Sequence, residues 1–103
     1  MEIPATQKAL LLYGTKMPYA LVEGYPVPEL RGAEVLVRNK AIGLNPIDWK
    51  APDFGFRLPQ MPYVAGRELA GVVAKVSGEG KWQVGDRVAV VSTDYRDLRK
   101  AAF

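Results

Sequence analysis

The stretch VAGRELAGVVAKV at residues 64–76, continued by VGDRV at residues 84–88, decides the fold class. Its second half is rich in Ala and Val, which favours a strand over residues 69–76. Gly71 inside this strand predicts a bend or a bulge, because glycine leaves no side chain to pack in a regular sheet. The stretch as a whole therefore predicts β-structure that is broken by turns.

Short strands separated by turns also account for the rest of the chain. Eight prolines and ten glycines divide the 103 residues into brief segments. Further strands are predicted at residues 7–13, 19–23, 34–42 and 87–91. Residues 25–29 are predicted to be extended, because each proline there pushes the preceding residue out of the helical region. Six or so short strands favour a mostly β fold, a partly open barrel or curled sheet.

The middle of the chain has a different character. In NPIDWK at residues 45–50, a capping residue is followed by proline at the first helical position, which predicts a single helical turn. Pro52 is expected to end this turn, and residues 53–61 to form a long central loop. No strand is followed by a long amphipathic helix, so the sequence predicts no parallel βαβ unit and no nucleotide-binding fold in these residues.

Composition excludes several kinds of chemistry. One hundred and three residues make a single domain, and the absence of Cys and His rules out disulfides, thiolate nucleophiles, imidazole bases and cysteine/histidine zinc sites within the chain. The net charge of +3 is spread among carboxylates, as in a solvated surface, so we expect no nucleic-acid partner. Short apolar runs and an N-terminus without a secretory pattern predict no membrane association and a cytoplasmic location.

Two motifs resemble one enzyme family. The segments AIGLNPIDWK at residues 41–50 and VAGRELAGVVAKV at residues 64–76, in register with VGDRV, resemble the N-terminal, GroES-like catalytic domain of medium-chain dehydrogenases/reductases. The resemblance covers nearly the whole chain. Zinc enzymes of this family carry a metal-binding Cys where this chain has Asn45 and a metal-binding His where it has Arg67. A guanidinium cannot bind zinc, so the chain resembles the zinc-independent branch of quinone oxidoreductases and enoyl reductases.

The motif Asn-Pro-x-Asp-Trp-Lys most resembles the corresponding segment of fungal trans-acting enoyl reductases. The resemblance implies a complete enzyme that transfers hydride from NADPH to an α,β-unsaturated, polyketide-type carbonyl, either free or bound to a carrier protein. It also implies a Rossmann domain, whose Gly-rich fingerprint this sequence lacks. We therefore expect residues 1–103 to be the GroES-like domain of a longer or truncated protein, inactive alone. The alternative is a non-catalytic interaction module that self-associates through an open sheet edge, or a gene fragment without a role of its own.

The resemblance implies roles for six side chains. Lys50 and Asp48 are the candidate catalytic residues, Asn45 and Lys50 the candidate cofactor contacts, and Trp49, Tyr63 and Arg67 the candidate walls of the substrate pocket. No metal site is expected.

Each candidate also has a purely structural interpretation. Asn45 is a good helix cap, Asp48 can stabilise the first turn through the helix dipole, and Lys50 can be a solvated surface lysine. The two aromatic residues can be ordinary packing between loop and barrel. For Arg67 we favour an ion pair with Glu68 that fills the space of the missing metal.

Overall fold

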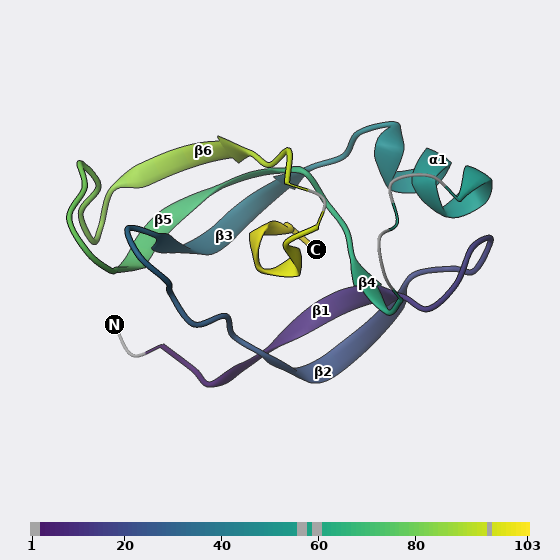
Figure 1. The fold of residues 1–103 in the computed structure, drawn as a ribbon, viewed down its shortest axis with the longest axis horizontal. Coiled ribbons are helices and arrows are strands. Elements are labelled where there is room, and N and C mark those ends of the chain that lie inside the picture. Colours follow the sequence, from purple (N-terminus) through teal and green to yellow (C-terminus); the bar gives the residue numbers. More distant parts are fainter. Residues whose placement is uncertain (1–2, 56–57, 59–60, 95) are drawn as a thin grey trace.

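The fold consists of two three-stranded sheets that face each other, with one short α-helix at an end (Figure 1). The computed structural model describes residues 3–55, 58, 61–94 and 96–103. The elements are β1 (Thr6–Leu12), β2 (Ala20–Pro26), β3 (Val35–Gly43), α1 (Ile47–Phe54), β4 (Tyr63–Val64), β5 (Glu68–Val76), β6 (Arg87–Val91) and the 3-10 helix η1 (Leu98–Lys100). The sheets have the orders β2-β1-β4 and β3-β5-β6, and the pairings between these strands are antiparallel.

This arrangement confirms the mostly β, partly open barrel. The two sheets leave a cavity of about 840 Å³ between them, lined by residues of both sheets and of the C-terminal segment. The buried hydrophobic core is small and centres on Leu12 of β1, Tyr63 of β4 and Ala65. Figure 1 shows η1 between the two sheets, so the C-terminal residues occupy part of the open interior.

The predicted irregularity at Gly71 is confirmed, and the extra residue lies in the partner strand. Asn39 pairs with Gly71 and Ala41 pairs with Ala70, so the register of β3 shifts by one residue at this point. A Cβ atom on Gly71 would lie 2.2 Å from the carbonyl oxygen of Arg38. Glycine therefore allows β3 and β5 to approach each other at the bulge.

The central segment differs from the prediction. The helix does not end before Pro52: α1 runs for eight residues and contains this proline. It ends at Gly55, whose φ of 72° is left-handed and whose N–H donates to the Ala51 carbonyl at 2.8 Å. Residues 53 and 54 are thus helical rather than loop, and residues 56, 57, 59 and 60 of the predicted loop lie outside the described residues.

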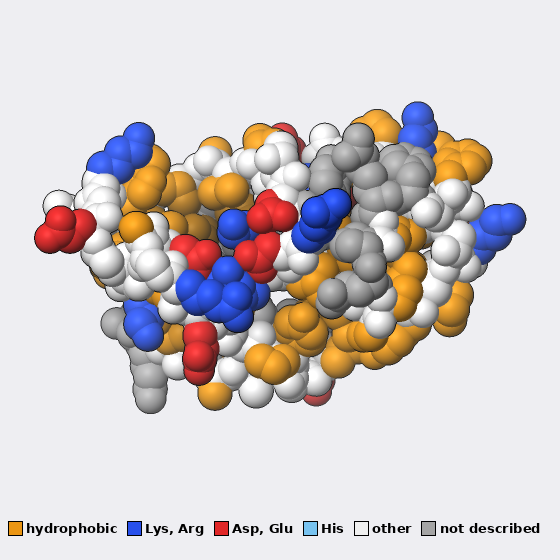
Figure 2. Space-filling view, viewed as in Figure 1, with side chains coloured by type: hydrophobic (Ala, Val, Ile, Leu, Met, Phe, Trp, Pro, Cys, Tyr) orange, Lys and Arg blue, Asp and Glu red, His pale blue; other side chains and the backbone are white. Residues whose placement is uncertain are grey.

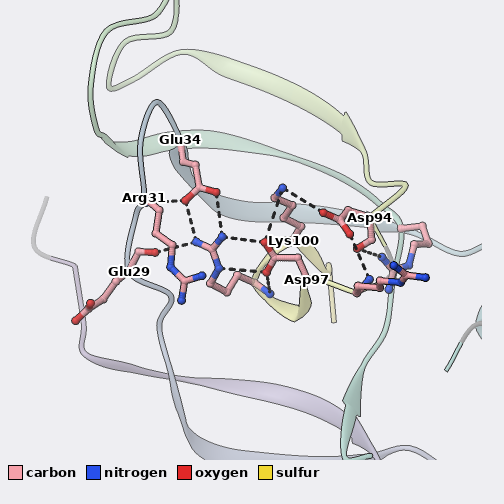
Figure 3. A network of polar contacts seen from close by, with 9 residues as sticks. Glu29, Arg31, Glu34, Asp94, Asp97 and Lys100 are labelled. Carbon is pink, nitrogen blue, oxygen red and sulfur yellow. Dashed lines mark hydrogen bonds and ion pairs between the residues drawn. The ribbon is translucent and has the colours of Figure 1, made fainter. Parts of the chain in front are cut away.

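An arginine holds the C-terminal segment to the start of β3. Arg99 donates to both carboxylate oxygens of Glu34, at 2.8 and 3.0 Å, to Asp97 at 2.8 Å and to the Glu29 carbonyl at 3.1 Å (Figure 3). On the face in Figure 2, basic and acidic side chains accordingly lie next to each other near the middle of the molecule. Hydrogen bonds from the Arg99 side chain and the Arg31 backbone lower the pKa of Glu34 to about 2.

Beyond Arg99, the last residues form backbone hydrogen bonds to the segment between β4 and β5. The Ala102 N–H donates to the Gly66 carbonyl at 3.0 Å, and the Phe103 N–H donates to the Ala65 carbonyl at 2.8 Å. The Asn39 side chain of β3 donates to the Ala102 carbonyl at 3.0 Å. The C-terminal residues are therefore tied to β3 and to the segment that connects β4 with β5.

The bulge gives the first prediction. Gly71→Ala should lower the free energy of unfolding by about 1–3 kcal/mol, because the new methyl group forces β3 and β5 apart. Urea unfolding followed by circular dichroism measures the change. Gly80→Ala is the matched control, since nothing lies within 4 Å of a Cβ at Gly80, and it should change stability by less than about 0.5 kcal/mol. Equal effects of the two substitutions would contradict the proposed close approach.

The Arg99 network gives the second prediction. Because the folded-state pKa of Glu34 lies below its ordinary value of 4.5, its contribution to stability is present above that value and is lost as the pH falls towards about 2. Arg99→Met removes the same hydrogen bonds at neutral pH and should therefore loosen the C-terminal segment. The loosening would be seen as faster hydrogen exchange at the Ala102 and Phe103 amides by NMR. The control is Arg96→Met, at an exposed position of the same segment. Unchanged exchange in the Arg99 variant would show that the network does not hold the C-terminus.

Candidate functional site

The candidate site is built on α1 and on the chain between β4 and β5. Asp48 accepts the backbone N–H of Asn45 at 2.8 Å through Oδ2, so the carboxylate closes the start of the helix. The sequence predicted that the Asn45 side chain would cap the helix. Instead, the Asn45 backbone N–H donates to the Asp48 side chain. The Lys50 N–H donates to the Pro46 carbonyl at 2.9 Å, which gives the first regular helical hydrogen bond. Asn45 itself is half-buried at the helix entrance.

A tyrosine next to β2 explains how Pro52 fits inside α1. Proline has no N–H, so it leaves the carbonyl of Asp48, four residues earlier, without its helical donor. The Tyr19 hydroxyl, just before β2, donates to this carbonyl at 2.6 Å. The Tyr19 ring also packs edge-to-face on Phe103, with centroids 5.5 Å apart. Tyr19 thus connects α1, β2 and the C-terminus, and no sequence signal pointed to this role.

Arg67 is the buried cation of the site. It is 7% exposed, and its guanidinium donates to the Tyr63 hydroxyl and, at 3.4 Å, to the Asp94 carbonyl. Its Cζ also lies 5.6 Å from the centroid of the Tyr63 ring. The predicted ion pair with Glu68 is not present between these two described residues: Glu68, the first residue of β5, is exposed, whereas Arg67 is buried.

The structure divides five of the six predicted residues into two groups, whereas the sixth, Asn45, is half-buried. Asp48, Tyr63 and Arg67 lie together, with 8%, 2% and 7% exposure, around a small chamber of about 10 Å³. Trp49 is 55% exposed and Lys50 is also exposed, with its Nζ 5.4 Å from the Trp49 ring centroid.

The two predicted catalytic residues therefore lie on opposite sides of α1: Lys50 faces outward and Asp48 faces the interior. Likewise, Trp49 and Tyr63 do not line one pocket. Helical geometry rotates each residue by about 100° around the axis, so Asp48 and Lys50, two positions apart, lie on nearly opposite sides of α1.

Burial and charge shape the electrostatics around Tyr19. Its burial, followed by the neighbouring Asp48 carboxylate and Tyr63, raises the pKa of Tyr19 to about 12, while Arg67 acts in the opposite direction. The phenol therefore remains a proton donor for the Asp48 carbonyl over the ordinary pH range.

Two further observations bear on the site. Among the residues that the structure describes, no group of three or more His, Cys, Asp or Glu side chains is placed to bind a metal. Within the same ranges no helix has both the length and the apolar character needed to cross a membrane.

Comparison with known proteins identifies the class of domain. Residues 31–101 match the alcohol dehydrogenase GroES-like domain family, which is more than half of the chain. The chain belongs to this family. Its fold is similar to that of the human synaptic vesicle membrane protein VAT-1 homolog-like protein, with a TM-score of 0.75 and 28% identity over 92% of this chain and 31% of that one. An alcohol dehydrogenase superfamily protein from Novosphingobium aromaticivorans gives a TM-score of 0.73 at 29% identity, covering 82% of this chain and 26% of that one.

Curated relatives include reductases and dehydrogenases. The chain is 38% identical over 93 residues to the trans-enoyl reductase mycC of Thermothelomyces thermophilus, covering 85% of this chain and 24% of that protein. It is 34% identical over 87 residues to the dehydrogenase pigH of Monascus ruber, covering 81% and 24%. The sorbitol dehydrogenase of Bacillus subtilis matches at 33% over 92 residues, covering 85% and 26%. The chain thus spans about a quarter of the length of these relatives.

The Tyr19 contact gives the third prediction. Tyr19→Phe should lower the free energy of unfolding by about 1 kcal/mol, because the Asp48 carbonyl loses its donor. Tyr13→Phe is the control, at a tyrosine that is 49% exposed. Since the folded-state pKa of Tyr19 is raised, its contribution to stability is present below pH 10.0 and lost as the pH rises through about 12.

Spectrophotometric titration of tyrosinate tests the pH dependence directly. The step of the wild-type titration that belongs to Tyr19, at about 12, should be missing from Tyr19→Phe and present in Tyr13→Phe. A wild-type titration in which every tyrosine ionises near its ordinary value would refute the buried hydrogen bond.

Proposed function

We propose that this domain is the substrate-facing part of a zinc-independent, NADPH-dependent enoyl reductase that acts on α,β-unsaturated, polyketide-type carbonyl compounds. The observation that carries the proposal is the arrangement of α1, which presents the exposed cation Lys50 beside the exposed Trp49 ring. The similarity to a protein named trans-enoyl reductase supports the same reaction class. Neither an imidazole nor a thiolate is required, which agrees with a chain that has no His or Cys.

Lys50 has the charge that such a reaction requires. Bound NADPH would supply a hydride to the β-carbon of the substrate, after which negative charge develops on the carbonyl oxygen. An ammonium group near this oxygen stabilises the enolate and thereby lowers the barrier. Because the Lys50 side chain is exposed on α1 and rests on Trp49, its ammonium group can reach a ligand at this surface. Trp49 would contribute an apolar wall for an acyl chain.

Asp48 acts on this site through the helix. Its carboxylate faces inward and holds the Asn45 N–H at 2.8 Å. We assign it the role of positioning Asn45 and Lys50 at the entrance of α1, where the Asn45 side chain and the Lys50 ammonium can contact the polar groups of the cofactor. The larger part of cofactor binding would fall to residues outside this chain, because its sequence has no Gly-rich dinucleotide fingerprint.

Arg67 supports a reaction without zinc. Its guanidinium is buried and already donates to the Tyr63 hydroxyl and the Asp94 carbonyl. A cationic side chain in this place repels a metal ion and has no lone pair to bind one. The catalytic contribution of positive charge therefore falls to Lys50.

The fourth prediction tests Lys50. In the protein expressed from its complete reading frame, Lys50→Met should lower kcat/KM for NADPH-dependent reduction of an enoyl thioester by roughly tenfold or more. The control is Lys40→Met, which changes an exposed lysine of β3. This substitution should leave kcat/KM unchanged. Equal rates for the wild type and the Lys50 variant, or activity that depends on added zinc, would refute the proposal.

Cofactor titration distinguishes the enzyme from an interaction module. NADPH is titrated into the wild-type protein and the Lys50→Met variant, and the oligomeric state is measured by analytical ultracentrifugation in both. Weaker NADPH binding by the variant supports the proposed role of Lys50. Self-association without cofactor binding would instead favour a module that pairs through a sheet edge.

A further inference from the structure

One oxygen of the Asp48 carboxylate has no partner among the described residues. Oδ2 accepts the Asn45 N–H, whereas Oδ1 is buried and makes no hydrogen bond to them. The side chain is 8% exposed, so bulk water does not solvate this oxygen. Buried carboxylate oxygens are costly unless they accept a hydrogen bond, so this atom requires a donor.

A small chamber lies beside Asp48. It is bounded by apolar groups of Ile47, Ala51 and Ala65 and by the polar groups of Tyr19, Tyr63 and Arg67. Its free volume is about 10 Å³, which is about the space for one water molecule. A water site also needs two or more polar partners, and this chamber is bounded by hydroxyl groups, a carboxylate and a guanidinium.

The charges around the chamber favour a neutral occupant. An anion would be repelled by Asp48, and a cation would be repelled by Arg67. A direct ion pair between Asp48 and Arg67 would satisfy Oδ1, but none joins these two described residues. Water can donate one hydrogen to Oδ1 and the other to a tyrosine oxygen. Tyr19 is suited to accept it, because its own hydrogen is used on the Asp48 carbonyl and the residue lines the chamber.

We propose that the chamber beneath α1 is a binding site for a single water molecule that joins Asp48 Oδ1 to the tyrosine hydroxyl groups. Through Tyr63, which accepts a hydrogen bond from Arg67, this water links the carboxylate to the buried guanidinium. The two buried charges thus compensate each other across a solvent bridge. This site is independent of the proposed enzymatic function, since its readouts are the position and lifetime of the water.

A crystal structure of the 103-residue chain at high resolution tests the site directly. We expect one isolated water peak at about 2.6–3.0 Å from Asp48 Oδ1. An empty chamber, an ion in it, or a direct contact between Oδ1 and the Arg67 guanidinium would overturn the proposal.

Water magnetic relaxation dispersion gives the test in solution. Asp48→Leu should remove one long-lived water from the count, whereas the isosteric Asp48→Asn, which keeps an acceptor oxygen, should retain it. An unchanged count in the leucine variant would overturn the proposal. Should that variant fail to fold, Tyr19→Phe provides the second measurement. It removes one partner of the water and should shorten the residence time at least tenfold, and an unchanged lifetime would count against the site.

Discussion

The short segment between Tyr63 and Glu68 is the connection on which both sheets depend. Tyr63 and Val64 pair with β1 in one sheet, and from Glu68 onward the chain pairs with β3 and β6 in the other. The carbonyl groups in between are used as acceptors: Arg67 receives the Ser92 N–H at 2.7 Å, and the two residues before it receive the C-terminal residues. A backbone that crosses between sheets must satisfy its polar groups, and here Ser92 and the C-terminal residues supply donors for three successive carbonyl groups.

This crossing also explains the character of the candidate site. Arg67 lies at the crossing, where its charge is enclosed by groups from several elements. The helix α1 covers the same region, with Asp48 turned inward and Lys50 turned outward. The domain therefore places two opposite charges, Asp48 and Arg67, in its interior and the Lys50 cation on its surface, two positions from Asp48 on α1. A buried charge fixes geometry, whereas an exposed one remains accessible to ligands.

Local sequence patterns predicted the strands well and the helix less well. Alternation and turn residues located β3, β5 and β6 to within about two residues. Pro52 was expected to end the helix, and this expectation was wrong because Tyr19, 29 residues away from Asp48, supplies the missing donor. The partner of Arg67 could not be predicted either. Its charged neighbour in sequence, Glu68, is exposed, and Tyr63 comes within reach where the chain passes from one sheet to the other.

The proline within α1 has a consequence for how the domain folds. An eight-residue helix is unstable alone, because few hydrogen bonds offset the cost of ordering its backbone. Pro52 removes one of these bonds, and its replacement comes from a residue next to β2. The helix can then be complete only after the hairpin of β1 and β2 has brought Tyr19 into place. We infer that α1 is among the last elements to form, so the candidate site is assembled at the end of folding rather than at its start.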